Sequence, residues 1–454
     1  MNKKKSYEID MCNGPLLGKI LLFSVPLMLS GVMQLLFNAA DIVVVGRFAG
    51  HQALAAVGST GALINLLVNV FIGLSVGTNV MVANYYGAND RERLSQTVHT
   101  AILSSIICGI GLIFVGVFLA RPMLALMGTP ADVLDQAALY MRIYFAGMPL
   151  FMLYNFGAAI LRAIGDTRRP LYYLLLAGVI NVLLNLYFVI RLEMGVAGVA
   201  WATVLSQIVS CALLLNALMH SEDAIRLELR KLKIHPARLR KMIRIGLPAG
   251  LQGAIFSVSN MLIQSSINSF GSIAMAGSTA AGNIEGFVYT AMNTFYQTAL
   301  SFTSQNVGAG KYRRAGRILL LCQVCVTVVG LVFGIGSYLC GRQLLGIYSS
   351  DPEVIAYGLV RMAFLCIPYF LCGNMDVMVG SLRGMGHSVM PMLVSLTGVC
   401  AFRILWIYTV FHRNHTPETL FISYPISWII TTAVHLLCFV IVYRKLCAGP
   451  APKN

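Results

Sequence analysis

The chain has 454 residues, of which 57% are hydrophobic and only 11% are charged, and its mean hydropathy is +0.76. A soluble domain carries about 25% charged residues, so this composition excludes an ordinary soluble protein and predicts an integral membrane protein. The formal net charge is +16, which by itself is compatible with a nucleic-acid partner. The placement of the basic residues therefore decides what the charge does.

Apolar stretches of about 20 residues, the length that spans a bilayer as a helix, recur along the whole chain. We expect the first to stay in the protein, because Glu8 and Asp10 follow the N-terminal lysines and no small-residue cleavage site closes the run. The pattern predicts an all-α protein with twelve membrane-spanning helices, at 16–45, 53–83, 94–119, 132–161, 169–190, 195–219, 243–268, 275–308, 315–341, 353–382, 388–411 and 420–443.

The basic residues are distributed unequally between the loops on the two sides of these spans. Of the 33 Lys and Arg, 25 fall in the loops that share a side with the termini and 5 in the opposite loops. The other three, Arg142, Arg361 and Arg403, lie within spans. Cytoplasmic loops carry such an excess, so both termini are predicted to be cytoplasmic. The charge orients the protein, and we expect no nucleic-acid partner.

One long polar stretch, SEDAIRLELRKLKIHPARLRKM (221–242), separates the sixth and seventh spans. It predicts an N-terminal six-helix lobe over 1–220, a cytoplasmic linker over 221–242 and a C-terminal six-helix lobe over 243–454. Its basic residues suit contact with anionic lipid, but a plain connector is the interpretation that we favour.

The two predicted lobes repeat one another. Pro26 matches Pro248 and Asn38 matches Asn260 at an offset of 222 residues, and two loops match at 221: NYYGANDRER (84–93) with QNVGAGKYRR (305–314), and LRAIGDTRRP (161–170) with LRGMGHSVMP (382–391). Because each half has an even number of spans, we expect two six-helix bundles related by a pseudo-two-fold axis along the membrane normal. Secondary transporters place their substrate near the midplane, between such repeats.

Asp41 stands out in the first span, within NAADIVVVGRF (38–48). Gln34, Asn38 and Asp41 fall at i, i+4 and i+7, so they share one helix face. A charged side chain at the bilayer centre costs about 2.5–3.5 kcal/mol or more, and it normally faces a protein interior or a watery cavity. Asp41 is therefore a candidate for exchanging a proton or holding an ion. The alternative is a structural carboxylate that reaches the outer headgroups, because Arg47 follows closely.

Further polar residues lie in the fifth and sixth spans. Asn181 and Asn185 share a face at i, i+4, and Thr203 lies in the next span. Together with Asp41 they offer oxygen ligands for Na⁺ or a hydrogen-bond network around a protonatable carboxylate. The alternative is that these groups serve only as hydrogen bonds between helices.

The second half has its own charged residues within spans: Glu285, Asp376 and Arg403. Because Arg403 and Glu285 are expected at similar depths in the membrane, we expect them to form a pair. Such a pair could serve a structural role or a functional one, and the sequence favours neither. Asp376 has no obvious partner in sequence, which makes it a candidate for binding a cation or substrate.

Other chemistry has little support in the sequence. Cys322 and Cys325 form a CxxC, and His412 and His415 an HxxH, but neither has further ligands at metal-site spacing. No HExxH and no phosphate-binding glycine loop occurs. We therefore expect no metal site, no cofactor and no enzymatic activity.

The segment NAADIVVVGRFAGHQALAAVG (38–58), the GA-containing loops after the second and eighth spans, and the LRxxGD and LRxxGH loops resemble the multidrug and toxic compound extrusion (MATE) family. The resemblance covers essentially the whole chain. It implies a secondary active efflux antiporter that exports small organic cations in exchange for H⁺ or Na⁺ by alternating access. It also implies a bacterial inner-membrane protein, and we expect a monomer.

Carried over by position, the family's coupling site in the first lobe would comprise Asp41, Asn181, Asn185 and Thr203. Many relatives have Asp where this chain has Asn185, so the site here carries one carboxylate. That departure favours H⁺ over Na⁺ as the coupling ion. Two alternatives stay open: an exporter of lipid-linked sugars or other amphiphiles from the same superfamily, and a channel or receptor.

Overall fold

The computed structural model describes residues 7–221 and 224–448, and every regular element within these ranges is a helix. Eight helical segments are long and apolar enough to cross a membrane. Two further spans are bent pairs, Ala131–Ala146 with Met148–Ala163 at 49° and Pro352–Leu365 with Tyr369–Gly384 at 45°. With α8 (Pro236–Asn268) and α9 (Ser272–Gly308), which are long enough but more polar, the predicted twelve are present. The prediction of an all-helical, multi-pass membrane protein is confirmed.

The chain forms two compact units, Met1–Asp10 with Val25–Ala254 and Met11–Ser24 with Ile255–Asn454. The first part of α1 thus belongs to unit 2, and the first part of α8 belongs to unit 1. The division at 1–220, 221–242 and 243–454 follows chain order and stays a prediction. The helices from α1 to α8 are α1 (Leu16–Val44), η1 (Val45–Ala49), α2 (His51–Gly87), α3 (Arg91–Leu126), α4 (Ala131–Ala146), α5 (Met148–Ala163), α6 (Arg168–Leu186), η2 (Tyr187–Arg191), α7 (Gly195–Met219), η3 (Leu229–Lys231) and α8.

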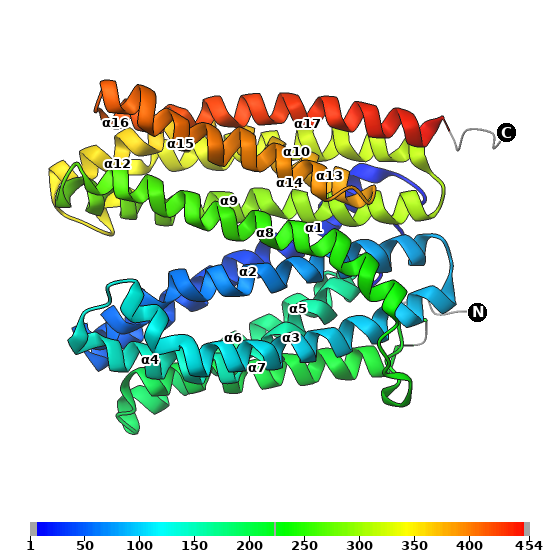
Figure 1. Cartoon of the computed structure of the whole chain (residues 1–454), viewed down its shortest axis with the longest axis horizontal. Coiled ribbons are helices and arrows are strands. Elements are labelled where there is room, and N and C mark those ends of the chain that lie inside the picture. Colours follow the sequence, from blue (N-terminus) through cyan, green and yellow to red (C-terminus); the bar gives the residue numbers. More distant parts are fainter. Residues whose placement is uncertain (1–6, 222–223, 449–454) are drawn as a thin grey trace. The chain divides into compact units, whose positions relative to one another are not determined.

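In unit 1, α2, α3, α6 and α7 run roughly along one direction (Figure 1). α5 packs against α2, α3 and α7, and α6 packs against α7. The interior between these helices is filled by large apolar side chains such as Leu112, Phe145, Met148 and Met152, all fully buried. The same core includes Val44, Val199 and Val204, which lie close in sequence to Asp41 and Thr203.

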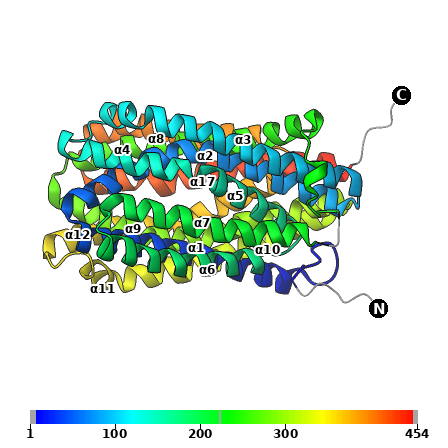
Figure 2. The same ribbon diagram turned by 90° about the horizontal axis from the view of Figure 1, so that it is seen from below.

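Unit 2 contains the remaining helices, and Figure 2 shows α9 and α10 running lengthwise. α9 packs against α10, α12 and α13, and α13 packs against α17. Phe302 of α9 meets Phe23 edge to face, with ring centroids 5.4 Å apart. The helices after α9 are α10 (Tyr312–Leu339), α11 (Gly341–Gly346), α12 (Pro352–Leu365), α13 (Tyr369–Gly384), α14 (Val389–Ser395), η4 (Leu396–Ala401), α15 (Phe402–Trp406), η5 (Ile407–Phe411), α16 (Pro417–Phe421) and α17 (Ser423–Cys447).

The predicted repeat is visible in local geometry. α2 and α9 are both 37 residues long, and each follows a glycine with positive φ, Gly50 at 88° and Gly271 at 94°. Such a φ is accessible to glycine at little cost. The bent helix pairs occur at corresponding places in the two halves. The same succession of elements therefore builds both halves.

The polar linker is fixed to unit 1 along its described part. Ile225 is fully buried, and the backbone N–H of Glu228 donates to Nε2 of the buried His99 on α3 at 3.1 Å. The backbone N–H of His235 donates to Thr100 Oγ1 on the same helix at 3.1 Å. Within the linker the short turn η3 comes first, and α8 begins at Pro236, a residue well suited to the first turn of a helix.

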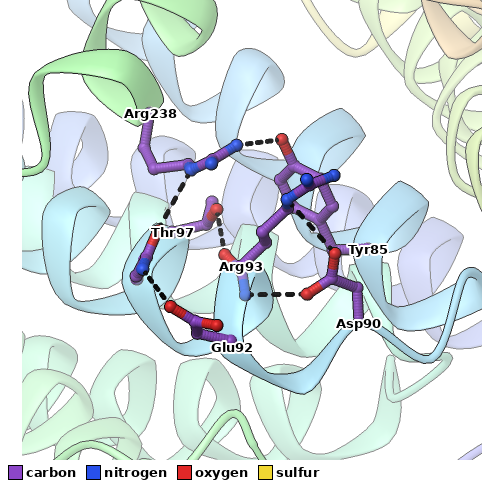
Figure 3. Close-up of polar contacts among 7 residues, drawn as sticks. Tyr85, Asp90, Glu92, Arg93, Thr97 and Arg238 are labelled. Carbon is purple, nitrogen blue, oxygen red and sulfur yellow. Dashed lines mark hydrogen bonds and ion pairs between the residues drawn. The ribbon is translucent and has the colours of Figure 1, made fainter.

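Arg238 at the start of α8 continues this attachment (Figure 3). Its guanidinium donates to Tyr85 Oη at 2.6 Å and to Gln96 Oε1 at 3.3 Å, and it lies over the Tyr85 ring. The beginning of α8 is thus held to the C-terminal end of α2 and to the N-terminal end of α3.

Deeper in unit 1, α2 and α8 approach one another through glycines. A Cβ placed on Gly73 would overlap the backbone of Gly250, and one on Gly246 would lie 2.6 Å from Cα of Leu74. Small residues at such contacts let membrane helices approach closely enough for van der Waals attraction to hold them together.

This contact gives a prediction about stability. Gly73→Ala should destabilise the protein by about 1–3 kcal/mol, because the added methyl group must displace backbone. The measurement is the thermal unfolding midpoint of the purified protein in detergent. Gly61→Ala on the same helix is the matched control, since a Cβ there meets nothing within 4 Å. Equal midpoints for the two variants would contradict the proposed tight contact.

Candidate functional site

The polar residues predicted in the first half form one connected network in unit 1. The side-chain amide of Asn185 on α6 donates to Asp41 Oδ1 on α1 and, at 3.4 Å, to Asn181 Oδ1 one turn earlier on α6. Asn181 Nδ2 in turn donates to Thr203 Oγ1 on α7 at 3.4 Å. Three helices therefore bring together the four residues Asp41, Asn181, Asn185 and Thr203.

Gln34 and Asn38 share the predicted helix face with Asp41, but both side chains are exposed and neither belongs to this hydrogen-bonded chain. Asp41 itself is half-buried, whereas Asn185 is fully buried. The helix face was predicted correctly, and the polar network uses only its last residue.

Two tyrosines that the sequence analysis did not single out lie beside the network. Tyr140 and Tyr144 on α4 stack with ring centroids 6.1 Å apart, and both are close enough to Asp41 to interact with it electrostatically. Their spacing of i, i+4 in YMRIY (140–144) puts them on one helix face. That spacing is the signal that could have found them, although aromatic pairs in spans are usually packing residues.

The helices change geometry next to the network. α1 ends at Val44, and the π-helical turn η1 begins at Val45, four residues after Asp41. α6 ends at Leu186 and passes directly into η2. η1 and η2 contact one another. Single π-helical turns inside α-helices are frequent at functional sites. In this unit two of them lie next to the only carboxylate of the network.

The network has unused hydrogen-bonding capacity. Asn185 Oδ1 is buried and has no hydrogen-bond partner among the described residues. When Asp41 is protonated, its carboxyl gains a donor, and this oxygen offers a matching acceptor. The oxygens of Asp41, Asn181, Asn185 and Thr203 are also the hard ligands that an alkali cation takes. The arrangement is chemically suited to either coupling ion.

In unit 2, Glu285 on α9 is paired with Arg361 on α12. Two nitrogens of the Arg361 guanidinium, Nε and Nη2, each donate to the Glu285 carboxylate at 2.8 Å. The third, Nη1, donates to Ser278 Oγ at 2.5 Å. The expectation that Glu285 meets Arg403 is wrong. Depth along the membrane does not determine which helices are neighbours, and α9 packs against α12.

Arg403 instead faces α17. It donates to Ser427 Oγ at 3.0 Å and its guanidinium lies 3.9 Å from the centre of the Tyr424 ring. Asp376, which has no obvious partner in sequence, lies beside the hydroxyl of Tyr289 on α9 and interacts with it electrostatically. The three predicted residues Glu285, Asp376 and Arg403 are therefore in three separate contacts.

The Glu285–Arg361 pair gives a prediction about structure. Glu285→Ala should cost about 3–5 kcal/mol of stability, because it leaves the nearly buried Arg361 charge unpaired. The double variant Glu285→Leu with Arg361→Met should recover most of the loss, since well-packed apolar residues often replace a buried ion pair. Thermal unfolding in detergent measures both. A double variant as unstable as the single one would argue against a purely structural pair.

The comparisons with known proteins agree with this architecture. The MatE family model matches residues 26–187 and 248–409. The second match lies 222 residues after the first at both ends, from 26 to 248 and from 187 to 409, which is the predicted offset of the repeat.

Similar proteins cover nearly the whole chain. The chain is 26% identical to the probable multidrug resistance protein YoeA of Bacillus subtilis, over 93% of each chain. It is also 26% identical to the FAD transporter of Shewanella oneidensis, over 75% of this chain and 76% of that one. A crystal structure of MATE in the straight conformation superposes with a TM-score of 0.89 at 21% identity, covering 98% of this chain and 100% of the other. The MatE family model matches the chain twice and covers most of its length, and the chain therefore belongs to the MatE family.

Proposed function

We propose that this protein is a secondary active exporter of small organic cations, driven by inward movement of H⁺ and coupled through Asp41. The observation that carries the proposal is the network in unit 1, in which a carboxylate within a membrane span is bonded to amide and hydroxyl groups. Family membership and relatives named as multidrug resistance proteins support export as the activity.

Asp41 is distinguished from Glu285 by its partner. Glu285 is neutralised by Arg361, whose guanidinium binds it in a bidentate pair. The described contacts of Asp41 include a hydrogen bond from a neutral amide but no ion pair with a cation. A carboxylate in a span that keeps its own charge can be neutralised by a proton or a metal cation, so Asp41 is the group whose charge changes during transport.

The proton is favoured over sodium because the network holds one carboxylate. With Asp41 ionised, binding one proton leaves the network neutral, and Asn185 Oδ1 is available to the new hydroxyl group. A sodium ion would have to be held by that single charge and by neutral oxygens. Sodium coupling through these residues is the less favoured version of the proposal.

Protonation is proposed to act through α1. Without its charge, Asp41 no longer attracts the Asn185 amide as strongly, and α1 can shift relative to α6. α1 also contains Pro26, which lacks an N–H for the helix ladder, and the Ser30 hydroxyl donates to the Pro26 carbonyl at 2.8 Å. We infer that repacking at this proline accompanies alternate exposure of the substrate site to either side of the membrane.

The proposal extends to location. The excess of basic residues on one side of the spans supports cytoplasmic termini, and the bacterial relatives support a bacterial cell membrane. A monomer is proposed. No cofactor is required by the proposed reaction, which moves solutes without making or breaking covalent bonds.

The first test of this proposal is Asp41→Asn. The variant should fold but lose proton-driven export by at least about tenfold, because it cannot change charge in the span. Export of a fluorescent lipophilic cation is measured in proteoliposomes under an imposed pH gradient without sodium. Asn38→Ala, at an exposed position one turn away on the same helix, is the matched control and should transport normally.

Two results of that assay decide the assignment. Normal export by Asp41→Asn would contradict coupling through unit 1. Absence of export by the wild type, with and without sodium, would contradict cation export and favour a flippase of lipid-linked sugars. Since one relative is named as a transporter of FAD, FAD belongs among the substrates tested.

A second test adds a charge to the network. Asn185→Asp would place two carboxylates next to one another, where like charges favour binding of a cation between them. Sodium should then stimulate export in this variant more than in the wild type, in the same proteoliposomes with and without a sodium gradient. Equal sodium responses would contradict the argument that the single carboxylate selects the proton.

A further inference from the structure

The two halves differ sharply at one repeated loop. In unit 1 the loop between α2 and α3 carries Asp90 and Glu92, and in unit 2 the corresponding residues at an offset of 221 are Lys311 and Arg313. The backbone is alike, since Asn89 and its counterpart Gly310 both have positive φ, 56° and 69°. The same turn therefore presents opposite charges in the two halves.

The loop of unit 1 satisfies its own charges (Figure 3). Asp90 accepts from the backbone N–H of Arg93 at 3.0 Å and pairs with its guanidinium at 3.3 Å. Glu92 accepts from Gln96 at 3.1 Å. Acidic residues at the start of α3 also suit the positive end of that helix. Nothing in this arrangement calls for an external anion.

The loop of unit 2 lacks this compensation. Lys311 donates to the Cys12 carbonyl at 3.0 Å and to Asn13 Oδ1 at 2.6 Å, and Arg314 donates to Asn306 Oδ1 at 3.1 Å. These acceptors are neutral, and within residues 7–221 and 224–448 no carboxylate is paired with Lys311, Arg313 or Arg314. The positive charges of the loop are held in place but are not neutralised.

These residues line a pocket of about 410 Å³, formed by Gly310, Lys311, Tyr312, Arg313, Arg314 and Cys447. The volume lies within the range of small-molecule sites, roughly 300–1,000 Å³. Arg317 and Arg313 both lie close enough to Tyr443 on α17 to interact with it electrostatically, and Arg444 and Lys445 occupy the last turn of α17. The pocket thus combines space with a dense positive charge.

We propose that this pocket binds the phosphate group of an anionic ligand, and that the ligand is an anionic phospholipid. Arginine and lysine are the side chains that bind phosphate oxygens most strongly. The pocket lies where α10 begins its membrane span, Tyr312–Leu339, and the ends of spans lie at the level of the lipid headgroups. Free phosphate shares this chemistry, so the test has to separate the two sources.

The test uses the full-length protein and Arg313→Glu, which gives the second loop the charge that Glu92 gives the first. Arg313 is exposed, so the variant should fold, which its elution and unfolding midpoint check. Native mass spectrometry counts bound phosphatidylglycerol and phosphatidylcholine on detergent-purified protein. Calorimetry on lipid-depleted protein measures binding of inorganic phosphate. Arg240→Glu makes the same charge change at an exposed position in unit 1 and serves as the matched control.

Arg313→Glu should bind phosphatidylglycerol at least about tenfold more weakly than the wild type, since each basic residue near an anionic surface contributes about fivefold. Arg240→Glu and phosphatidylcholine binding should be unchanged. Loss of inorganic phosphate binding with unchanged lipid binding would keep the site but overturn the lipid as its ligand. Equal losses in the two charge-reversal variants, or no loss in either assay, would overturn the site itself.

Discussion

A carboxylate within a membrane span has to be neutralised, hydrogen-bonded or hydrated, and this requirement organises both units. The protein meets it differently for each of its three deep acids. Glu285 has a bidentate arginine, Asp376 has the hydroxyl of Tyr289, and Asp41 has the amide of Asn185. Only the first partner removes the charge. The strength of pairing therefore separates an acid that stabilises the fold from acids that can still gain a proton or a cation.

The internal repeat shows how one scaffold supports unlike chemistry. Helix lengths, glycine positions and bent pairs recur in both halves because they set the backbone path. The charged positions recur only in part: Asp90 corresponds to Lys311, whereas Arg361, the arginine of the Glu285 pair, corresponds to another arginine, Arg142, at an offset of 219. Backbone geometry is preserved where a side chain would not fit, and side-chain chemistry has diverged where the backbone leaves room for it.

The sequence allowed the architecture to be predicted well, because hydropathy indicates the length of each span. An even number of spans in each half also returns the chain to the side of the membrane on which that half began. It also predicted the polar cluster of unit 1, because i, i+4 spacing places Asn181 and Asn185 on one face. It failed for Glu285, whose partner depends on which helices are neighbours. It also failed for Tyr140 and Tyr144, since aromatic residues in a span give no sign of which carboxylate they face. Pairing across helices is a property of packing, and one sequence without the fold does not contain it.

The helix that carries Asp41, α1, is divided between the two units. The residues of α1 before Val25 belong to unit 2, whereas Asp41 and its partners on α6 and α7 belong to unit 1. α8 repeats this arrangement, with its first part in unit 1 held by Arg238 and by close glycine contacts. Under the proposed coupling, α1 is anchored at its start and loses a charge-assisted hydrogen bond near its end, so we expect the helix to bend or slide between these two positions. Pro26, one residue inside the change of unit, is the position where the helix ladder already lacks a hydrogen bond. The same helix thus joins the site that is proposed to change charge to a position where the helix ladder lacks a hydrogen bond.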